Sequence, residues 1–128
     1  MAESNVKDSI LESTKKLLGY DPDYRAFDLD ILIHINSVFS TLQQLGVGPE
    51  KGYSIDGPED KWSDFLGTSN DINSVKSYIY QKVRLAFDPP ATSFAIDAVK
   101  EQIREAEFRL NVAADKPPIV VRTGRRRA

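Results

Sequence analysis

Residues 28–45 read DLDILIHINSVFSTLQQL, and this stretch decides the fold class. Its apolar residues recur at helical spacing, and Gly46 follows as a helix stop. The two aspartates at its start suit a helix N-terminus, where free N–H groups favour negative charge. The first half is apolar almost all round, so we expect this helix to be buried on more than one side, either centrally in a bundle or at a subunit interface.

The rest of the chain predicts further helices and one long loop. A short amphipathic helix is expected over 5–18, two further helices over 70–87 and 92–111, and a helix of one or two turns over 62–66. Residues 46–60 contain four glycines and two prolines, which predicts a loop. The fold class is therefore all-α: a small helical bundle of about four main helices plus a short one, with a long loop and an extended C-terminal tail.

Charge divides the chain into a body and a tail. Residues 1–114 carry twelve basic and eighteen acidic side chains, a net charge of −6. Residues 115–128 carry five basic side chains and one acidic one, a net charge of +4. We therefore expect a helical domain over 1–114, which includes the loop 46–60, and an extended basic tail over 115–128.

No set of residues predicts catalysis, metal binding or a cofactor. The chain has no cysteine, and its single histidine, His34, lies in the apolar helix, where a core or interface role is expected. The four aspartates between positions 21 and 30 lack the glycine turn and terminal glutamate of a calcium loop, so they are expected in caps and turns. Core packing, rather than base stacking, is expected for Tyr78, Tyr80, Phe87, Phe94 and Phe108. The protein is not expected to be an enzyme.

Neither a secretion signal nor a membrane span is expected. The N-terminus is polar and acidic, and the longest apolar run is only a few residues. These features predict a protein that is made and assembled in a cytoplasm.

The C-terminal tail carries the strongest functional signal. Two prolines end the last helix, a β-prone triplet follows, and four arginines come near the end. The triplet would add a strand to a partner's sheet edge while the arginines face phosphates or an acidic surface; a merely solubilising tail is the alternative. The candidate partner-binding residues are Pro117, Pro118, Ile119, Val120, Val121, Arg122, Arg125, Arg126 and Arg127.

Five stretches of the sequence are together typical of one protein family. They are DILIHIN (30–36), LQQLGVGP (42–49), WSDFLG (62–67), VKSYIYQKVRLAFDPP (75–90) and EFRLN (107–111). This pattern resembles the head–tail connector proteins of tailed bacteriophages, also called adaptors or head-completion proteins. The resemblance covers roughly residues 26–112, whereas the tail departs from the family pattern.

The resemblance implies a structural virion protein of the phage neck, assembled in the host cytoplasm. It implies a homo-oligomeric ring, expected to be dodecameric, that sits beneath the portal, meets a stopper or tail-completion protein, and lets genomic DNA pass without sequence-specific binding. Residues 113–128 would dock into the portal. The loop residues expected to face the channel or the next ring are Val47, Pro49, Lys51, Tyr53 and Ile55, and the subunit-interface candidates are Ile31, Ile35 and Trp62.

Two other functions are compatible with the sequence. A transient tail-assembly or packaging accessory protein would have the same composition. A nucleic-acid-binding regulator would need a basic recognition helix, and no predicted helix is strongly basic. For Trp62, sealing the end of the bundle and anchoring a partner are both open.

Overall fold

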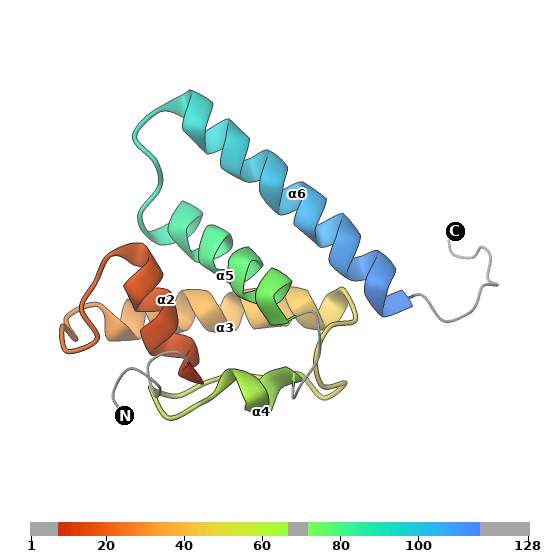
Figure 1. Cartoon of the computed structure of the whole chain (residues 1–128), viewed down its shortest axis with the longest axis horizontal. Coiled ribbons are helices and arrows are strands. Elements are labelled where there is room, and N and C mark those ends of the chain that lie inside the picture. Colours follow the sequence, from red (N-terminus) through yellow and green to blue (C-terminus); the bar gives the residue numbers. More distant parts are fainter. Residues whose placement is uncertain (1–7, 67–71, 116–128) are drawn as a thin grey trace.

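The computed structural model describes residues 8–66 and 72–115 of the chain (Figure 1). Its helices are α2 (Ile10–Leu18), α3 (Asp28–Gln44), α4 (Trp62–Leu66), α5 (Ile72–Phe87) and α6 (Ser93–Asp115). No strand occurs among the described residues, where the one β-type contact is an isolated bridge between Ser9 and Lys61. Four main helices and the short α4 confirm the predicted all-α bundle.

Helix α5 is the central helix of the bundle. It packs against α2, α3 and α6, and α2 also packs against α3. Figure 1 shows α6 on one side of α5, with α3 on the other. Because α6 meets the bundle mainly through α5, much of its surface faces away from the other helices.

Local signals in the sequence set several helix ends. The Ser9 hydroxyl accepts the Glu12 N–H at 3.2 Å and caps α2, which Gly19 ends in the left-handed conformation at φ +98°. Thr92 caps α6 in the same way, accepting the Ala95 N–H at 3.1 Å. Helix α6 continues to Asp115, beyond the predicted end at residue 111, because no residue that breaks a helix intervenes.

The core forms where α2, α3, α5, the loop and one stripe of α6 meet. Its buried apolar residues are Ile10, Leu11, Ile31, Ile35, Val38, Phe39, Leu42, Val47, Ile55, Trp62, Phe65, Val75, Tyr78, Ile79, Val83, Ile103 and Leu110. Helix α3 buries one face in this core, but Leu29 and Ile33 are 69% and 58% exposed. The bundle therefore does not bury α3 on more than one side, and burial of its open side at a subunit interface stays a prediction.

The predicted core positions of the aromatic residues are only partly confirmed. Tyr78 is fully buried, and Tyr80 and Phe87 are partly buried. Phe94 and Phe108 are 84% and 71% exposed, so their predicted place in the core is wrong. Among the described helices α6 packs mainly against α5, so side chains that point away from α5 stay in solvent.

Candidate functional site

The aspartates between positions 21 and 30 lie in a turn and in the first turn of α3, as predicted. The Asp21 carboxylate accepts the Asp23 N–H at 2.9 Å, and Asp28 and Asp30 lie where the helix dipole favours negative charge. Across residues 8–66 and 72–115, no three histidine, aspartate or glutamate side chains are grouped to hold a metal ion. Their geometry is that of structural turns and caps.

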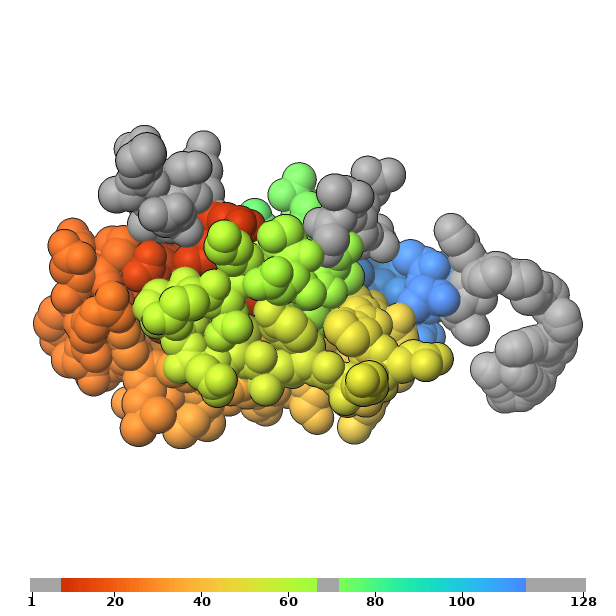
Figure 2. Space-filling view, turned by 90° about the horizontal axis from the view of Figure 1, so that it is seen from below, coloured from red at the N-terminus to blue at the C-terminus, as the bar shows by residue number. Residues whose placement is uncertain are grey.

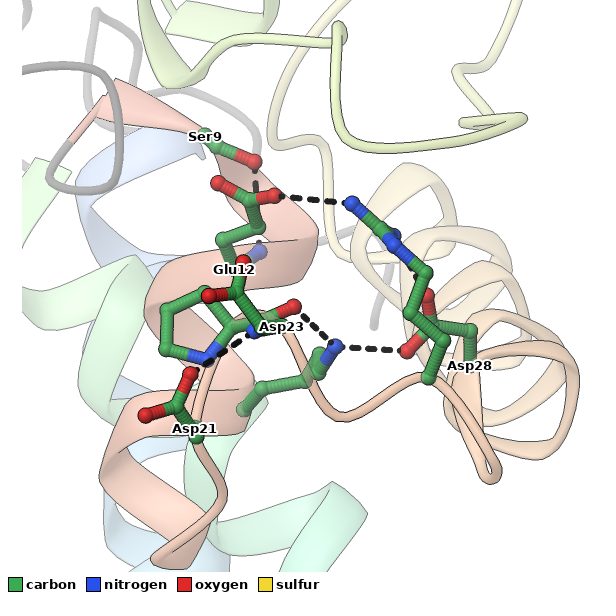
Figure 3. Close-up of polar contacts among 8 residues, drawn as sticks. Ser9, Glu12, Asp21, Asp23 and Asp28 are labelled. Carbon is green, nitrogen blue, oxygen red and sulfur yellow. Dashed lines mark hydrogen bonds and ion pairs between the residues drawn. The ribbon is translucent and has the colours of Figure 1, made fainter. Parts of the chain in front are cut away.

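The buried Lys15, which no pattern in the sequence pointed to, ties this turn to α2 through polar contacts near Asp28, which Figure 3 labels. Lys15 is 1% exposed; its Nζ lies 2.7 Å from Asp28 Oδ1 and donates to the Pro22 carbonyl at 2.9 Å. Arg25 extends the cluster and lies 2.8 Å from Asp28 and 3.6 Å from Glu12. Since a buried charge without a partner is strongly unfavourable, these contacts fix the path of the chain from α2 to α3.

His34 lies at the edge of a groove rather than in the core. Its ring is partly buried, with its centre 6.1 Å from that of Phe87. The groove, of about 250 Å³, runs between α3 and α5 and is lined by His34, Ser37, Val38, Lys82, Leu85 and Ala86. The histidine therefore keeps contact with solvent at the junction of two helices.

The loop 46–60 lies against the body of the molecule together with α4. Figure 2 shows residues 46–66, coloured yellow to light green, as one continuous layer over this face. Asn36 of α3 holds the loop, because its Nδ2 donates to the Ile55 carbonyl at 3.0 Å and its Oδ1 accepts the Ile55 N–H at 2.8 Å. The Tyr53 ring packs at 5.1 Å from the rings of both Phe39 and Phe65.

The five loop residues predicted to face the channel or the next ring differ in how deeply they are buried. Val47 and Ile55 are buried in the core of the single chain, so the prediction that they face a channel or another ring is wrong. Pro49 and Lys51 are exposed, and Tyr53 is partly buried. Only these three can meet a partner without a change in the loop.

The three predicted subunit-interface residues also belong to the core. Ile31 and Ile35 have no exposed surface, and Trp62 is almost completely buried. The Trp62 indole N–H donates to Ser13 Oγ at 2.9 Å, so this side chain joins α4 to α2. A neighbouring subunit could not touch these side chains, and the prediction is corrected accordingly.

Other apolar side chains are exposed in their place. The large ones are Leu17, Tyr24, Leu29, Ile33, Phe94, Phe108 and Val112. On α3 and again on the C-terminal half of α6, two of them lie four positions apart, on one side of the helix. The surplus of apolar residues on α3 was visible in the sequence, but which of its faces the bundle would cover was not.

A groove of about 630 Å³ runs beside one of these surfaces, between α5 and α6. Its lining residues are Asn73, Ser74, Ser77, Ala106, Phe108, Arg109, Leu110, Val112 and Ala113. Polar contacts hold the two helices together next to it: the Tyr78 hydroxyl donates to Glu107 at 2.7 Å, and Gln81 donates to Gln102 at 2.7 Å. Burial, followed by the hydrogen bond and the charge of Glu107, raises the pKa of Tyr78 above its ordinary value.

The predicted partner-binding residues of the tail, 117–127, lie outside the described residues. Within the described part of the chain, none of the helices combines the length and the apolar character needed to cross a bilayer.

Comparison with known proteins identifies the family. Residues 10–117 match the family described as phage connector protein, a span that includes all the helices from α2 to α6. Searches of curated proteins and of solved structures gave no significant match. The chain therefore belongs to the phage connector protein family, as its resemblance to head–tail connectors implied.

Proposed function

We propose that several copies of this protein form a ring between the phage portal and the tail or stopper, which completes the head and extends the DNA channel. Membership of the phage connector family supports a structural role at the head–tail junction. The observation that carries the ring is the set of paired apolar side chains left exposed on α3 and α6. Exposed apolar side chains that group on one side of a helix are candidates for a surface that another protein covers.

The charge of the body is consistent with a channel wall. Residues 1–114 carry a net charge of −6, and an acidic wall repels the DNA phosphates, so that the genome slides without sticking. Neutralising those acids that face the channel should slow genome exit, because cationic surface would then dominate. Unchanged ejection kinetics would count against this part of the proposal.

Native mass spectrometry of the protein mixed with the portal of its own phage tests the ring. We expect a discrete addition of several copies per portal, with twelve as the expected number. Addition of a single copy, or none, would contradict the ring. Absence of the protein from purified virions would then favour a transient assembly or packaging accessory.

A further inference from the structure

One exposed surface, here called the α3 ridge, consists of Leu29, Asp30 and Ile33. Its two apolar residues lie one helical turn apart and are 69% and 58% exposed. Asp30 is exposed beside them. The ridge thus presents two apolar side chains flanked on one side by a carboxylate.

A second exposed surface, here called the α6 patch, consists of Phe108, Arg109 and Val112. Its apolar residues are again four positions apart, and they are 71% and 50% exposed. Among the described residues, the ion-pair contact of the exposed Arg109 side chain is a long one, 3.9 Å from Glu105. The patch therefore repeats the spacing of the α3 ridge (apolar, charged, two residues, apolar) with the opposite charge.

The two surfaces cannot meet within one chain. The ridge lies in the N-terminal half of α3 and the patch in the C-terminal half of α6, and Figure 1 shows these half-helices toward opposite ends of the molecule. A contact between unlike surfaces of successive copies is head-to-tail, and such contacts close into rings when the rotation between copies allows. A twofold dimer that pairs each surface with itself would leave like charges together, and one that pairs ridge with patch reciprocally would close at two copies, so neither would build a ring.

We propose that the α3 ridge of one copy docks on the α6 patch of the next copy, with the two helices antiparallel. This inference rests on the proposed ring and names the contact that builds it. Hydrophobic contact between the four apolar side chains supplies attraction, and the Asp30–Arg109 pair supplies orientation.

The antiparallel direction follows from the shared pattern. In both surfaces the charged residue follows the first apolar residue, so it lies on the same rotational side of its helix. When two such helices pack antiparallel, the two charged residues lie on the same edge of the contact and can pair. When they pack parallel, the charged residues lie on opposite edges. The antiparallel register sets Leu29 opposite Val112 and Ile33 opposite Phe108.

The groove of about 630 Å³ beside the patch gives the incoming side chains room. Its α5 wall is made of the small polar residues Asn73, Ser74 and Ser77, which do not cover the patch. Two apolar residues on each side make a smaller contact than the roughly 800 Å² per partner of a standard interface. The contact should thus be weak between free subunits and become effective where the portal holds them at high local concentration.

Charge reversal tests the pairing on the full-length protein with the purified portal, read by native mass spectrometry. Asp30→Arg and Arg109→Asp should each weaken addition of further copies by about tenfold or more, and the double variant should recover it. Phe94→Ser is the matched control, because Phe94 is exposed on α6 but lies outside the patch. Circular dichroism should show all variants folded, since the altered side chains are exposed.

Disulfide trapping tests the direction, and the absence of native cysteine makes the result unambiguous. Under mild oxidation on the portal, Leu29→Cys combined with Val112→Cys should link successive copies into a ladder. The matched pair Leu29→Cys with Phe108→Cys, which faces only in the parallel register, should not. Self-linking of Val112→Cys alone would overturn the proposal in favour of a twofold contact.

Other outcomes separate this inference from the ring itself. If the wild type adds several copies per portal but neither reversal weakens addition, the inference is wrong and the ring stands. If a reversal prevents even the first copy from binding, the surface meets the portal instead, which also overturns the inference. If the wild type adds no more than one copy, the proposed function fails.

Discussion

Lys15 shows how one residue fixes the junction between two helices. Its ammonium group is buried with Asp28 and the Pro22 carbonyl as partners, whereas its neighbour Lys16 is exposed on the same helix. Lys15→Met should lower the free energy of unfolding by roughly 2–4 kcal/mol, because Asp28 loses its shortest ion pair in a largely buried site. Lys16→Met should change it by less than about 0.5 kcal/mol. Urea unfolding of both variants checks this, and equal losses would mean that the buried pair adds no stability.

Tyr78 makes stability depend on pH at the alkaline end. Its pKa is raised in the folded state, first by burial and then by Glu107, so the folded protein keeps a proton that the unfolded chain loses above about pH 10. Its contribution is therefore fully present below that pH and is lost as the pH rises further. Burial, with Asp60 and Asp64 nearby, raises the pKa of Tyr53 and acts in the same direction.

Replacement of Tyr78 by phenylalanine tests this linkage. Tyr78→Phe should lower the free energy of unfolding at pH 7 by about 1–2 kcal/mol, because the hydrogen bond to Glu107 is lost. It should also make the decline of stability above pH 10 less steep. Tyr80→Phe, at a partly buried position of the same helix, is the control for both effects. An unchanged alkaline decline in Tyr78→Phe would assign that decline to other groups.

Residue roles were predictable where they depend on neighbours in the sequence. The cap at Thr92 and the left-handed helix end at Gly19 each depend on only a few adjacent positions. The exposure of Phe94 and Phe108 depends on which helices flank α6, which spacing alone cannot supply. Lys15 resembles any lysine near a helix end until the turn that follows folds back over it.

At the scale of elements, the helices were predictable from the sequence, but the position of the loop 46–60 on the bundle was not. Its glycines and prolines indicated irregular structure correctly, but its position depends on Asn36, which is 19 residues away from Ile55 in the sequence. The asparagine side chain pairs with both backbone groups of Ile55, as a neighbouring strand would. An interaction of this kind has no signature in local composition.

Asn36→Ala should release the loop without unfolding the bundle. The two lost hydrogen bonds leave the backbone of Ile55 without partners in a partly buried site, at a cost of about 2–3 kcal/mol. Hydrogen exchange should accelerate most over residues 50–60 and least in α5. Ser40→Ala, at an exposed position of α3, is the control. Unchanged exchange in the loop would show that the aromatic contacts of Tyr53 hold it by themselves.

Substitutions at Gly19 and Gly48 distinguish the cost of backbone strain from the cost of a steric clash. Gly19 and Gly48 both have positive φ, +98° and +88°, but a Cβ on Gly19 would meet no atom within 4 Å, whereas one on Gly48 would overlap the Phe65 ring. Gly19→Ala should cost about 1–2 kcal/mol for the left-handed backbone alone. Gly48→Ala should cost at least about 1 kcal/mol more, because the ring or the loop must move. Thermal unfolding of the two variants measures the difference, and equal losses would indicate that Phe65 gives way freely.

At the scale of the whole molecule, the fold class and the family were predictable from the sequence. Which apolar residues are buried in the core and which are exposed was not. The all-α bundle followed from apolar spacing, and the family from five stretches of sequence spread along the chain. Ile31 and Ile35 are predicted at an interface because α3 has more apolar residues than one face needs, and Trp62 because a lone tryptophan after a loop can anchor a partner. The bundle covers the face with Ile31 and Ile35 and leaves the face with Leu29 and Ile33 open, which depends on how α2 and α5 pack together.

Deletion of the C-terminal tail tests whether the helical body folds without it and whether the tail binds the portal. Removing residues 116–128 takes away five basic residues and no acidic one, so the net charge falls from −2 to −7. Every core residue that is buried within residues 8–66 and 72–115 lies between positions 10 and 110, so the unfolding temperature should change by less than about 4 °C. Portal binding should be lost if this segment docks there.

A second variant separates the apolar and basic contributions of the tail. Replacing Arg122, Arg125, Arg126 and Arg127 by serine keeps the Ile119–Val121 triplet and removes most of the positive charge. We expect weaker portal binding with a shallower dependence on salt, since screening acts on exposed charge pairs. Titration of the portal at two salt concentrations measures both quantities. Wild-type affinity and salt dependence in this variant would contradict an electrostatic role, and wild-type affinity in the deletion would contradict docking by the tail altogether.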